Sequence, residues 1–442
     1  MKFCSNILKF GVFAAGAAQV VLADSVDGVG KISFSKHYGR TYQEARQNEL
    51  SDKAAAGNDD GIIDISNQNV YYSASIYLGT PGQELSVLLD TGSSDLWVPQ
   101  SGGFHCPDES DCQSDSGNFD PSSSSSFKKN DTVDGFSIQY GDNSYAAGYW
   151  ATDDLRVGDI TVKDMTIAVA DDTNSSDAVF GISYRGLESS IFSNDLQDPH
   201  EYENFPYLLK DQGIVKRNAY SLYLNAPGAS DGSVLFGGVD HNKYSGNLYT
   251  VPVLENEGGP DPWQRFVVAV RGVGVKGNQE QTTLTTTPFV GLLDSGTTAV
   301  YLPEPVADMI AKAYGGSFDD DPEVLAYIIQ CPGNDEKLVF NFGGFNIETS
   351  LANYITERHG DQCLLNIVPS DGEMAILGDY FLRDAYVVYD MDNNEISLAQ
   401  ANFDSNEDIE AITGPVPSAT RAPGYSQSYN GPETFQTGGN IF

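Results

Sequence analysis

The sequence contains few histidines, cysteines and basic residues. Its 442 residues include five histidines, five cysteines and 24 Lys plus Arg, against 62 Asp plus Glu. A chain this acidic repels phosphate backbones, so nucleic acid is not an expected partner. The G-x-S-x-G signature of serine hydrolases and the H-E-x-x-H signature of zinc metalloproteases are both absent from the sequence. Neither a cofactor nor a metal site is predicted.

Long hydrophobic runs are also lacking. The apolar-biased stretch at residues 10–22 has 13 residues and contains Gln19, and no later run approaches the 18 or so needed to span a bilayer. Lysines precede this stretch and a small-residue cleavage pattern ends it at Ala23, which predicts a secretory signal peptide at residues 1–23. The mature chain is therefore expected to be secreted and to have no membrane anchor, with association to a cell wall as an open alternative.

Cysteine usage fits an oxidising compartment. Removal of the signal peptide would leave four cysteines: Cys106, Cys112, Cys331 and Cys363. Four cysteines allow three disulfide pairings. Pairing of nearest neighbours would give each half of the chain its own bridge.

A repeated five-residue motif is the strongest positive signal. Each copy follows an apolar run, and the copies are Asp90, Thr91, Gly92, Ser93, Ser94 and Asp294, Ser295, Gly296, Thr297, Thr298. The two aspartates are 204 residues apart, and each is followed by an aromatic residue seven positions later and a proline nine positions later. A second match, VFG at 179–181 and ILG at 376–378, follows at similar offsets. The pattern predicts a duplicated half-domain whose two-fold axis brings the two aspartates together.

Two carboxylates in one space cannot easily both ionise. At about 3 Å and an effective dielectric near 20, their repulsion is roughly 5 kcal/mol, or about four pK units, so one proton should be held between them. The ionised carboxylate could take a proton from water while the protonated one donates to a peptide carbonyl oxygen, without a covalent intermediate. Gly92 and Gly296 would let backbone N–H groups approach the carboxylates. Ser93 and Thr297 could hydrogen-bond their outer oxygens.

The motifs, their order and their spacing resemble the pepsin-like aspartic proteases over residues 61–404, and most closely the fungal secreted, yapsin-like members. YYSASIYLGTPGQ at 71–83 and FDPSSSSSF at 119–127 also match family segments. The resemblance implies a mostly β, bilobal fold with pseudo-two-fold symmetry and a flap hairpin. It also implies a monomeric endopeptidase that hydrolyses polypeptides at acidic pH, with Asp90 and Asp294 sharing a proton as this family's dyads do.

The resemblance assigns roles to residues around the two aspartates. Thr91 and Ser295 resemble the family's cross-linked hydroxyl pair, which supports both catalytic loops. The tip of the family's flap is matched by Tyr140, Gly141 and Asp142. Trp97 is expected to support the Tyr140 hydroxyl. A carboxylate at Asp142, beside the first specificity pocket, would favour Lys or Arg before the scissile bond, so cleavage near both hydrophobic and basic residues is expected.

The two ends of the chain differ from its middle. Residues 24–57 resemble a propeptide, which in the family lies across the cleft as an intramolecular inhibitor while a basic residue neutralises the aspartates. Lys31 and Lys36 are both candidates for that residue. Residues 405–442 are rich in Pro, Gly, Ser and Thr and are predicted to be a disordered tail.

The middle of the chain is strand-like, with short alternating runs between Gly, Asn and Asp turns. The segment LFGGVD at 235–240 resembles the family's crossover between lobes. It predicts an N-terminal β lobe at residues 58–238, which carries Asp90 and the flap. A C-terminal β lobe at 239–404 would carry Asp294.

Two kinds of covalent modification are expected. The resemblance implies one disulfide between Cys106 and Cys112 and another between Cys331 and Cys363. The sequons that begin at Asn130 and Asn174 predict glycans on surface loops.

Two rivals compete with the protease hypothesis. A catalytically silent, protease-like secreted binding protein would be expected to lose one aspartate or the flap tyrosine, but the sequence keeps Asp90, Asp294 and Tyr140. Glycoside hydrolases also use two carboxylates. The matching hydroxyl and glycine residues around both aspartates favour peptide hydrolysis instead.

Overall fold

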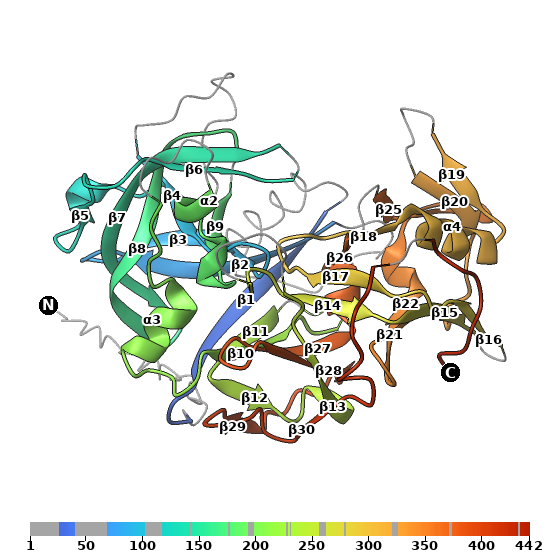
Figure 1. Cartoon of the computed structure of the whole chain (residues 1–442). Helices are drawn as coiled ribbons and strands as arrows, with labels where there is room; N and C mark the ends of the chain where they lie inside the picture. The colour runs from blue at the N-terminus through green and yellow to red at the C-terminus, as the bar shows by residue number, and fades with distance from the viewer. Residues whose placement is uncertain are drawn as a thin grey trace, which may run out of the picture.

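The protein consists mostly of β-strands, arranged as two lobes above a shared sheet (Figure 1). The computed structural model describes residues 26–39, 69–101, 117–141, 143–175, 177–192, 199–226, 229, 231–255, 262–277, 280–320, 326–370, 374–431 and 434–442. The predicted signal peptide, Cys106, Cys112 and Asp142 lie outside these residues. Within them, no helix has the length and apolar character needed to span a membrane.

One fifteen-stranded sheet runs through the molecule, in the order β30-β13-β28-β27-β10-β11-β1-β2-β3-β9-β4-β8-β7-β5, with β6 paired to β7. The strands up to β9 are β1 (Gly30–Gly39), β2 (Asn69–Leu78), β3 (Gln83–Asp90), β4 (Leu96–Pro99), β5 (Lys128–Lys129), β6 (Phe136–Gln139), β7 (Tyr145–Val157), β8 (Ile160–Thr173) and β9 (Ala178–Gly181). The others are β10 (Ala219–Tyr223), β11 (Asp231–Phe236), β13 (Tyr244–Pro252), β27 (Ala385–Asp390), β28 (Glu395–Ala401) and β30 (Ala419–Arg421). Because β10 pairs with β27, strands from both halves of the chain share this sheet.

Three smaller sheets form the second lobe. The first has the order β14 (Val267–Val270), β17 (Phe289–Leu293), β26 (Met374–Leu377), β18 (Val300–Pro303), β25 (Ile367–Ser370). The second has the order β16 (Gln281–Thr285), β15 (Gly272–Lys276), β21 (Lys337–Asn341), β22 (Asn346–Ser350). The third has the order β19 (Ser317–Asp319), β20 (Ala326–Gln330), β24 (Gln362–Leu365), β23 (Ile355–His359).

Helices are short. The α-helices are α2 (Ser189–Phe192), α3 (Phe205–Asp211), α4 (Glu304–Ala313) and α5 (Asp379–Leu382), and the 3-10 helices are η1 (Pro121–Ser123), η2 (Arg185–Leu187) and η3 (Leu351–Tyr354). The longest helix of the described residues, α4, buries Val306 and Ile310, one turn apart, on the face toward the core. The sequence prediction of a mostly β chain with few helices is confirmed.

The predicted duplication is visible in the strand pairing. In the first half, β3 runs parallel to β9, β9 antiparallel to β4, and β4 parallel to β8. In the second half, β17, β26, β18 and β25 repeat the same order and the same directions. The apolar runs before each aspartate become strands whose residues are mostly buried, as expected for parallel pairs inside a core.

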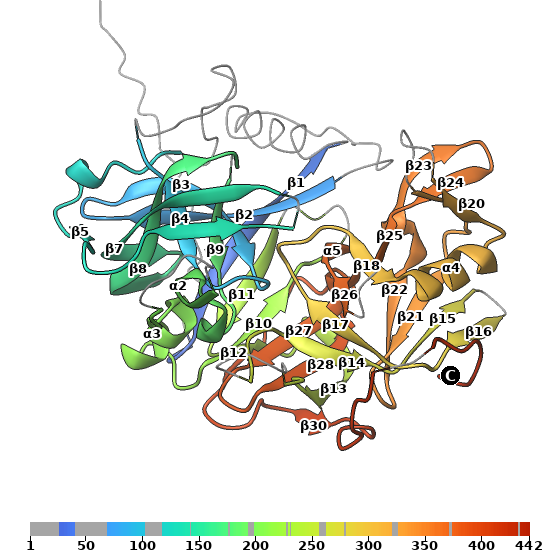
Figure 2. The ribbon, with the colours of Figure 1, turned by 45° about the horizontal axis from the view of Figure 1, so that its top comes forward.

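Strand β1 belongs to the predicted propeptide, and the structure inserts it into the shared sheet between β11 and β2 (Figure 2). Ile32 and Phe34 are buried there. Lys31 forms an ion pair with Glu407, and Lys36 Nζ donates to backbone carbonyls at 3.0 and 2.9 Å. The expectation that one of these lysines lies against the two aspartates is therefore wrong for this structure. The alternating apolar residues that predict a strand here place that strand in the shared sheet, which determines where its lysines lie.

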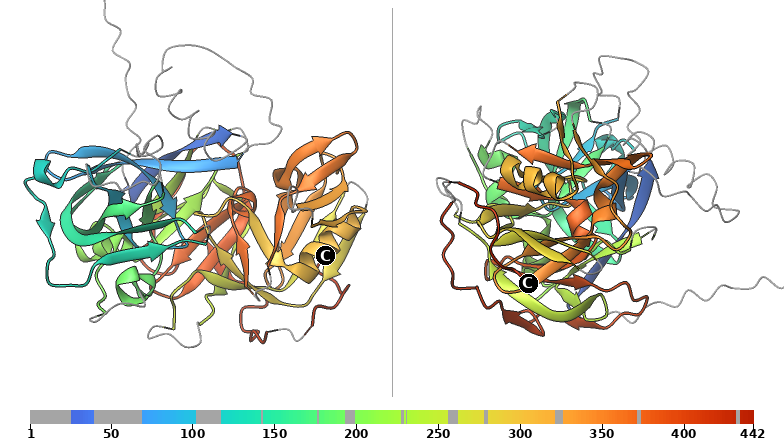
Figure 3. Two further views of the ribbon diagram at one scale, coloured as in Figure 1. Left: turned by 90° about the horizontal axis from the view of Figure 1, so that it is seen from above. Right: turned by 90° about the vertical axis from the view of Figure 1, so that its right-hand side faces the viewer.

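The described residues beyond 404 form an ordered strap that runs along the shared sheet and then reaches the second lobe (Figure 3). Strand β29 (Ile409–Ala411) pairs with β12 (Gly238–Asp240), and β30 pairs in parallel with β13. Farther on, Gly438 N donates to Leu284 O at 2.8 Å. The prediction of a disordered tail is wrong, because a few buried apolar side chains and sheet-edge hydrogen bonds offset a polar composition.

Loss of one buried strap residue should destabilise the protein. Ile412 is fully buried, so Ile412→Ala should lower the free energy of unfolding by about 2–4 kcal/mol. The neighbouring Thr413 is exposed, and Thr413→Ala should change it by less than about 0.5 kcal/mol. Chemical denaturation of both variants measures the difference. Equal values would mean that the strap does not pack as described.

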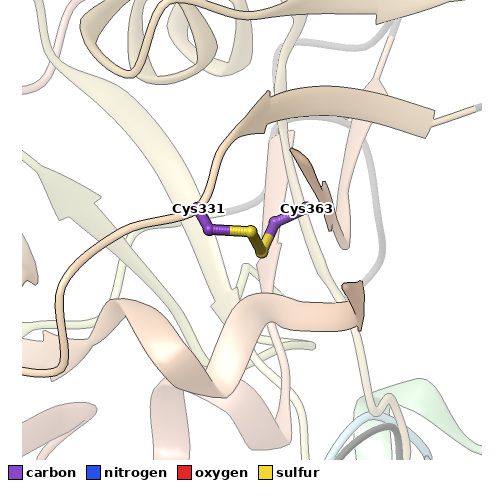
Figure 4. Close-up of a disulfide and its surroundings, with 2 residues drawn as sticks. All are labelled: Cys331 and Cys363. Carbon is purple, nitrogen blue, oxygen red and sulfur yellow. A yellow bond between two sulfur atoms is a disulfide. The ribbon is translucent and has the colours of Figure 1, made fainter. Parts of the chain in front are cut away.

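The disulfide between Cys331 and Cys363 confirms one predicted pair (Figure 4). It joins the segment after β20 to the paired strand β24, within the second lobe. The two cysteines are 32 residues apart in the sequence. In the chain-entropy model, a disulfide that closes a loop of this length stabilises the folded protein by about 3–4 kcal/mol.

Candidate active site

Each aspartate of the repeated motif lies where a buried strand ends. Asp90 is the last residue of β3, and Asp294 follows β17 directly. Gly181 and Gly378, the glycines of the second sequence match, lie under the two loops. A Cβ at Gly181 would be 2.5 Å from Ser94 N, and one at Gly378 would overlap the backbone of the second loop. Only glycine therefore fits where the loops pack so closely.

The structure brings Asp90 and Asp294 together. Each glycine of the motif packs against the opposite aspartate: a Cβ at Gly92 would be 2.5 Å from Asp294 Oδ1, and one at Gly296 would overlap Asp90 Oδ1. The two carboxyl groups also hydrogen-bond to each other. Their exposed fractions are 6% and 8%, so both are largely desolvated.

Each carboxylate is held by its own loop, in the same way on both sides. Gly92 N donates to Asp90 Oδ1 at 2.7 Å, and Ser93 Oγ donates to Oδ2. In the second loop, Gly296 N donates to Asp294 Oδ1 at 2.9 Å, and the hydroxyl of Thr297 donates to Oδ2 at 2.7 Å. These are the contacts that the sequence predicted for the four residues, and they orient both carboxyl groups.

Thr91 and Ser295 link the two loops through a reciprocal set of buried hydrogen bonds. Thr91 N donates to Ser295 Oγ at 3.1 Å, and Ser295 N donates to Thr91 Oγ1 at 2.9 Å. Each hydroxyl then donates across the axis, Thr91 to Leu293 O and Ser295 to Leu89 O, both at 2.9 Å. The cross-link implied by the family resemblance is present, and it fixes the separation of the aspartates.

Removal of one hydroxyl from this cross-link should be costly. Ser295→Ala leaves Thr91 N and Leu89 O without their buried partner, which should lower the free energy of unfolding by about 2–3 kcal/mol. Ser295→Thr keeps the hydroxyl and should lose less than about 1 kcal/mol. Urea denaturation of the two variants tests the expectation. An alanine variant as stable as the threonine variant would contradict it.

Burial and charge favour a proton on the pair. Burial, and next the negative charge of Asp294, raise the pKa of Asp90, while hydrogen bonds from Ser93 and Gly92 oppose the rise. A raised pKa means that the carboxyl holds its proton at pH values where a solvated aspartate has lost it. The site can therefore present one protonated and one ionised carboxyl side by side, an acid and a base.

A further buried acid, Asp379, lies beside the Asp294 loop, where its backbone N–H donates to Thr297 O at 2.8 Å, and it was not predicted. It opens α5, directly after Gly378, and its side chain is 2% exposed. Burial raises its pKa well above the usual range, the charge of Arg383 lowers it, and the charge of Asp294 raises it again. The glycine of the second motif match, which precedes it, was the only signal in the sequence.

The hairpin β6–β7, here called the flap, is tied through Tyr140 to the strand that follows the Asp90 loop. Trp97 Nε1 donates to the Tyr140 hydroxyl at 2.7 Å, and Trp97 is buried on β4, the strand that follows the Asp90 loop. The turn is closed by Tyr140 N, which donates to Ser144 O at 2.8 Å. Gly141 is exposed at the tip.

A second network of buried acids supports the Asp90 loop, and sequence reasoning missed it. Tyr202 OH donates to Asp95 Oδ1 at 2.6 Å, and Ser189 N donates to Asp95 Oδ2 at 3.0 Å. Glu188 is fully buried and accepts from Tyr202 N at 2.9 Å. Burial raises the pKa of Glu188 to about 10 and also raises that of Asp95. Asp95 follows the first motif directly, but nothing in the sequence marks Glu188.

The remaining predicted positions lie at the surface. Asn130 is partly exposed, and its Oδ1 accepts from Thr132 N at 3.1 Å, while Asn174 is exposed at the end of β8. Their glycosylation stays a prediction. Among the described residues, no group of three or more His, Cys, Asp or Glu side chains is arranged to hold a metal ion.

Comparison with known proteins agrees with this geometry. The family model described as "Eukaryotic aspartyl protease" matches residues 71–401. "Aspartic proteinase yapsin-3" from Saccharomyces cerevisiae is 40% identical over 93% of this chain and 80% of its own length. "Aspartic proteinase MKC7" from the same yeast is 36% identical over 99% of this chain and 83% of its own. "Probable aspartic-type endopeptidase opsB" from Aspergillus fumigatus is 37% identical over 81% of this chain and 75% of its own.

Proposed function

This chain belongs to the eukaryotic aspartyl protease family, and from that premise we propose that it is a secreted endopeptidase that hydrolyses peptide bonds at acidic pH with Asp90 and Asp294. The observation that carries the proposal is the reciprocal packing of the two aspartates, each backed by the glycine of the opposite loop. Such packing forces two carboxyl groups into one desolvated space. The two groups cannot form an ion pair with each other, because both carry a negative charge when ionised.

The catalytic step follows from the shared proton. The ionised carboxyl takes a proton from the attacking water, whose oxygen bonds to the peptide carbonyl carbon, while the protonated carboxyl donates to the carbonyl oxygen. Collapse of the tetrahedral species then breaks the C–N bond: the carboxyl that took the water's proton gives it to the leaving nitrogen, and the other carboxylate takes a proton from a hydroxyl of the diol, which leaves a carboxylic acid and restores the shared proton. The four donors Gly92, Ser93, Gly296 and Thr297 hold both carboxyl groups in place throughout.

The flap supplies the cover that this chemistry needs. Tyr140 would close over a bound peptide from its position against Trp97, and exclusion of water would strengthen every electrostatic interaction below it. The substrates are polypeptides, as the family implies. Thr91 and Ser295 keep the two loops in register while the peptide is bound.

Secretion and maturation complete the proposal. Residues 1–23 would be removed as a signal peptide and residues 24–57 as a propeptide, leaving lobes at 58–238 and 239–404 in a monomer. The excess of 62 acidic over 24 basic residues supports an acidic working pH, where protonation relieves self-repulsion. The insertion of β1 into the shared sheet supports an intramolecular role for the propeptide.

A peptide-library digest of the processed protein at pH 3 to 6 tests the proposal. Cleavage is expected to be strongest in this range and to stop when a statine-type inhibitor, which mimics the tetrahedral species, is added. No cleavage by a folded, processed protein would refute the proposal. Cleavage that persists under the inhibitor would refute the assigned mechanism.

The preference for residues before the scissile bond is proposed to include basic as well as apolar side chains, because Asp142 follows the flap tip in the sequence. Its position lies outside the described residues. Asp142→Ala should lower kcat/KM about tenfold for a peptide with Lys before the scissile bond, and change it less than twofold for the same peptide with Phe. Equal losses on both peptides would contradict the proposal.

A further inference from the structure

Side chains from outside the hairpin hold the end of the flap, and of these only Trp97 was expected. Trp97 on β4 holds the tyrosine at the tip. Asn174, directly after β8, holds the opposite arm: its Oδ1 accepts from Tyr145 N at 2.7 Å. Tyr145 is the first residue of β7 and therefore the point where the flap turn joins its second strand.

Asn174 continues the ladder between β7 and β8 past its last regular pair. That pair is Ala146 with Thr173. One residue farther, Asn174 N donates to Tyr145 O at 3.3 Å, and its side chain returns the second hydrogen bond that a strand partner would make. The amide Nδ2 also reaches Asn143 O in the turn at 3.4 Å. Asn174 thus binds both the turn and the strand that leaves it.

The support behind Asn174 is rigid. Strand β8 pairs with β7 along most of its length, and in parallel with β4 beside Trp97. The support for Trp97 and Asn174 therefore comes from neighbouring strands of one sheet. Thr173 Oγ1 adds a 2.5 Å hydrogen bond to Tyr145 O, and Asp172 accepts from the Tyr145 hydroxyl at 3.0 Å. The turn that precedes Tyr145 contains exposed residues, and its Asn143 has a left-handed backbone with φ of 68°.

We propose that Asn174 is a positioning residue of the flap, whose side-chain oxygen keeps the hairpin lowered so that Tyr140 covers a bound peptide. The inference rests on the proposed endopeptidase function. Because the flap must open and close, its tether should be a small number of hydrogen bonds on an exposed hinge, and the Oδ1 contact has that character. The side chain touches the flap backbone and acts through it.

Steady-state kinetics on a peptide substrate tests this role. Asn174→Ala should raise KM about fivefold, which corresponds to the loss of one hydrogen bond, and should leave kcat within about twofold of the wild-type value. Asn174→Asp keeps the acceptor for Tyr145 N and should restore KM to within about twofold of wild type. Ser176→Ala removes the predicted sequon but leaves the carboxamide, so it separates loss of a glycan from loss of the tether. Asn130→Gln, at the other sequon, should leave both constants unchanged.

Two further measurements separate positioning from a general loss of structure. Titration of active sites with a tight inhibitor corrects for inactive protein, which would lower apparent kcat without moving KM. Hydrogen exchange at the Tyr145 amide should be faster in Asn174→Ala than in Ser176→Ala and unchanged in Asn174→Asp. KM values and exchange rates equal in Asn174→Ala and Ser176→Ala would overturn the proposal. A wild-type protein that cleaves nothing would refute the endopeptidase function alone, since the exchange measurement would still decide on Asn174.

Discussion

Asp90→Asn is expected to lower kcat for peptide hydrolysis by about 10³- to 10⁴-fold while the protein stays folded. Asparagine has nearly the shape of aspartate and can still accept the hydrogen bond from Gly92 N. It cannot exchange a proton with Asp294, so the site loses either its acid or its base. Asp294→Asn should lower kcat by the same factor, because the two residues act as one unit. The double variant should then be hardly worse than either single one.

Stability gives the same variant an independent readout. Burial and the neighbouring Asp294 raise the pKa of Asp90, so the native protein binds this proton more tightly than the unfolded chain does. Its contribution to stability is full at low pH and falls as pH rises toward the native pKa. Asp90→Asn should therefore be as stable as wild type in acid and more stable at neutral pH.

Asp211→Asn is the matched control, since Asp211 is exposed on α3 and far in sequence from either loop. It should keep wild-type kcat. The assignment of Asp90 would be overturned if Asp90→Asn retained activity comparable to Asp211→Asn at equal purity.

The pair of Asp90 and Asp294 could be predicted because its motif occurs twice in the sequence. Each copy carries its own strand, its own hydrogen-bond donors and its own glycine, and local pattern is enough to identify these features. Duplication then supplies the long-range information that a single motif lacks, namely that Asp90 and Asp294 face each other. The same reasoning found Thr91 with Ser295, although the geometry of their hydrogen bonds became visible only in the structure.

Features that depend on unrepeated long-range contacts could not be predicted. Composition marked residues 405–442 as disordered, yet three buried side chains, Ile412, Val416 and Ala422, help to secure the strap, and the first two pack against strands of the shared sheet. An average of composition over a stretch of sequence does not reveal so few buried side chains. Glu188 likewise looks like an ordinary surface acid in the sequence, and only the fold shows that it is buried beside Asp95 and Tyr202.

The protein should lose stability between acidic and neutral pH, and Glu188 should be a main cause. Its ordinary pKa of 4.5 is raised to about 10 by burial. Below pH 4.5 the carboxyl is protonated in both the native and the unfolded states, so nothing is lost. Above it, the unfolded chain ionises while the native protein keeps the proton, which costs about 1.4 kcal/mol per pH unit, or about 3 kcal/mol at pH 7. Burial raises the pKa of Asp95 and Asp379 as well, which adds to the same trend.

Glu188→Gln isolates this effect, because glutamine can accept the same hydrogen bond from Tyr202 N and carries no titrating group. Its free energy of unfolding should match wild type at pH 4 and exceed it by up to about 3 kcal/mol at pH 7. Denaturant titrations across this range measure the gap, with Glu280→Gln as an exposed control that should follow wild type throughout. Parallel curves for wild type and Glu188→Gln would show that the buried acid does not drive the loss. A widening gap would mean that the acids supporting the Asp90 loop stabilise the folded protein most in the acidic range that we propose for its dyad.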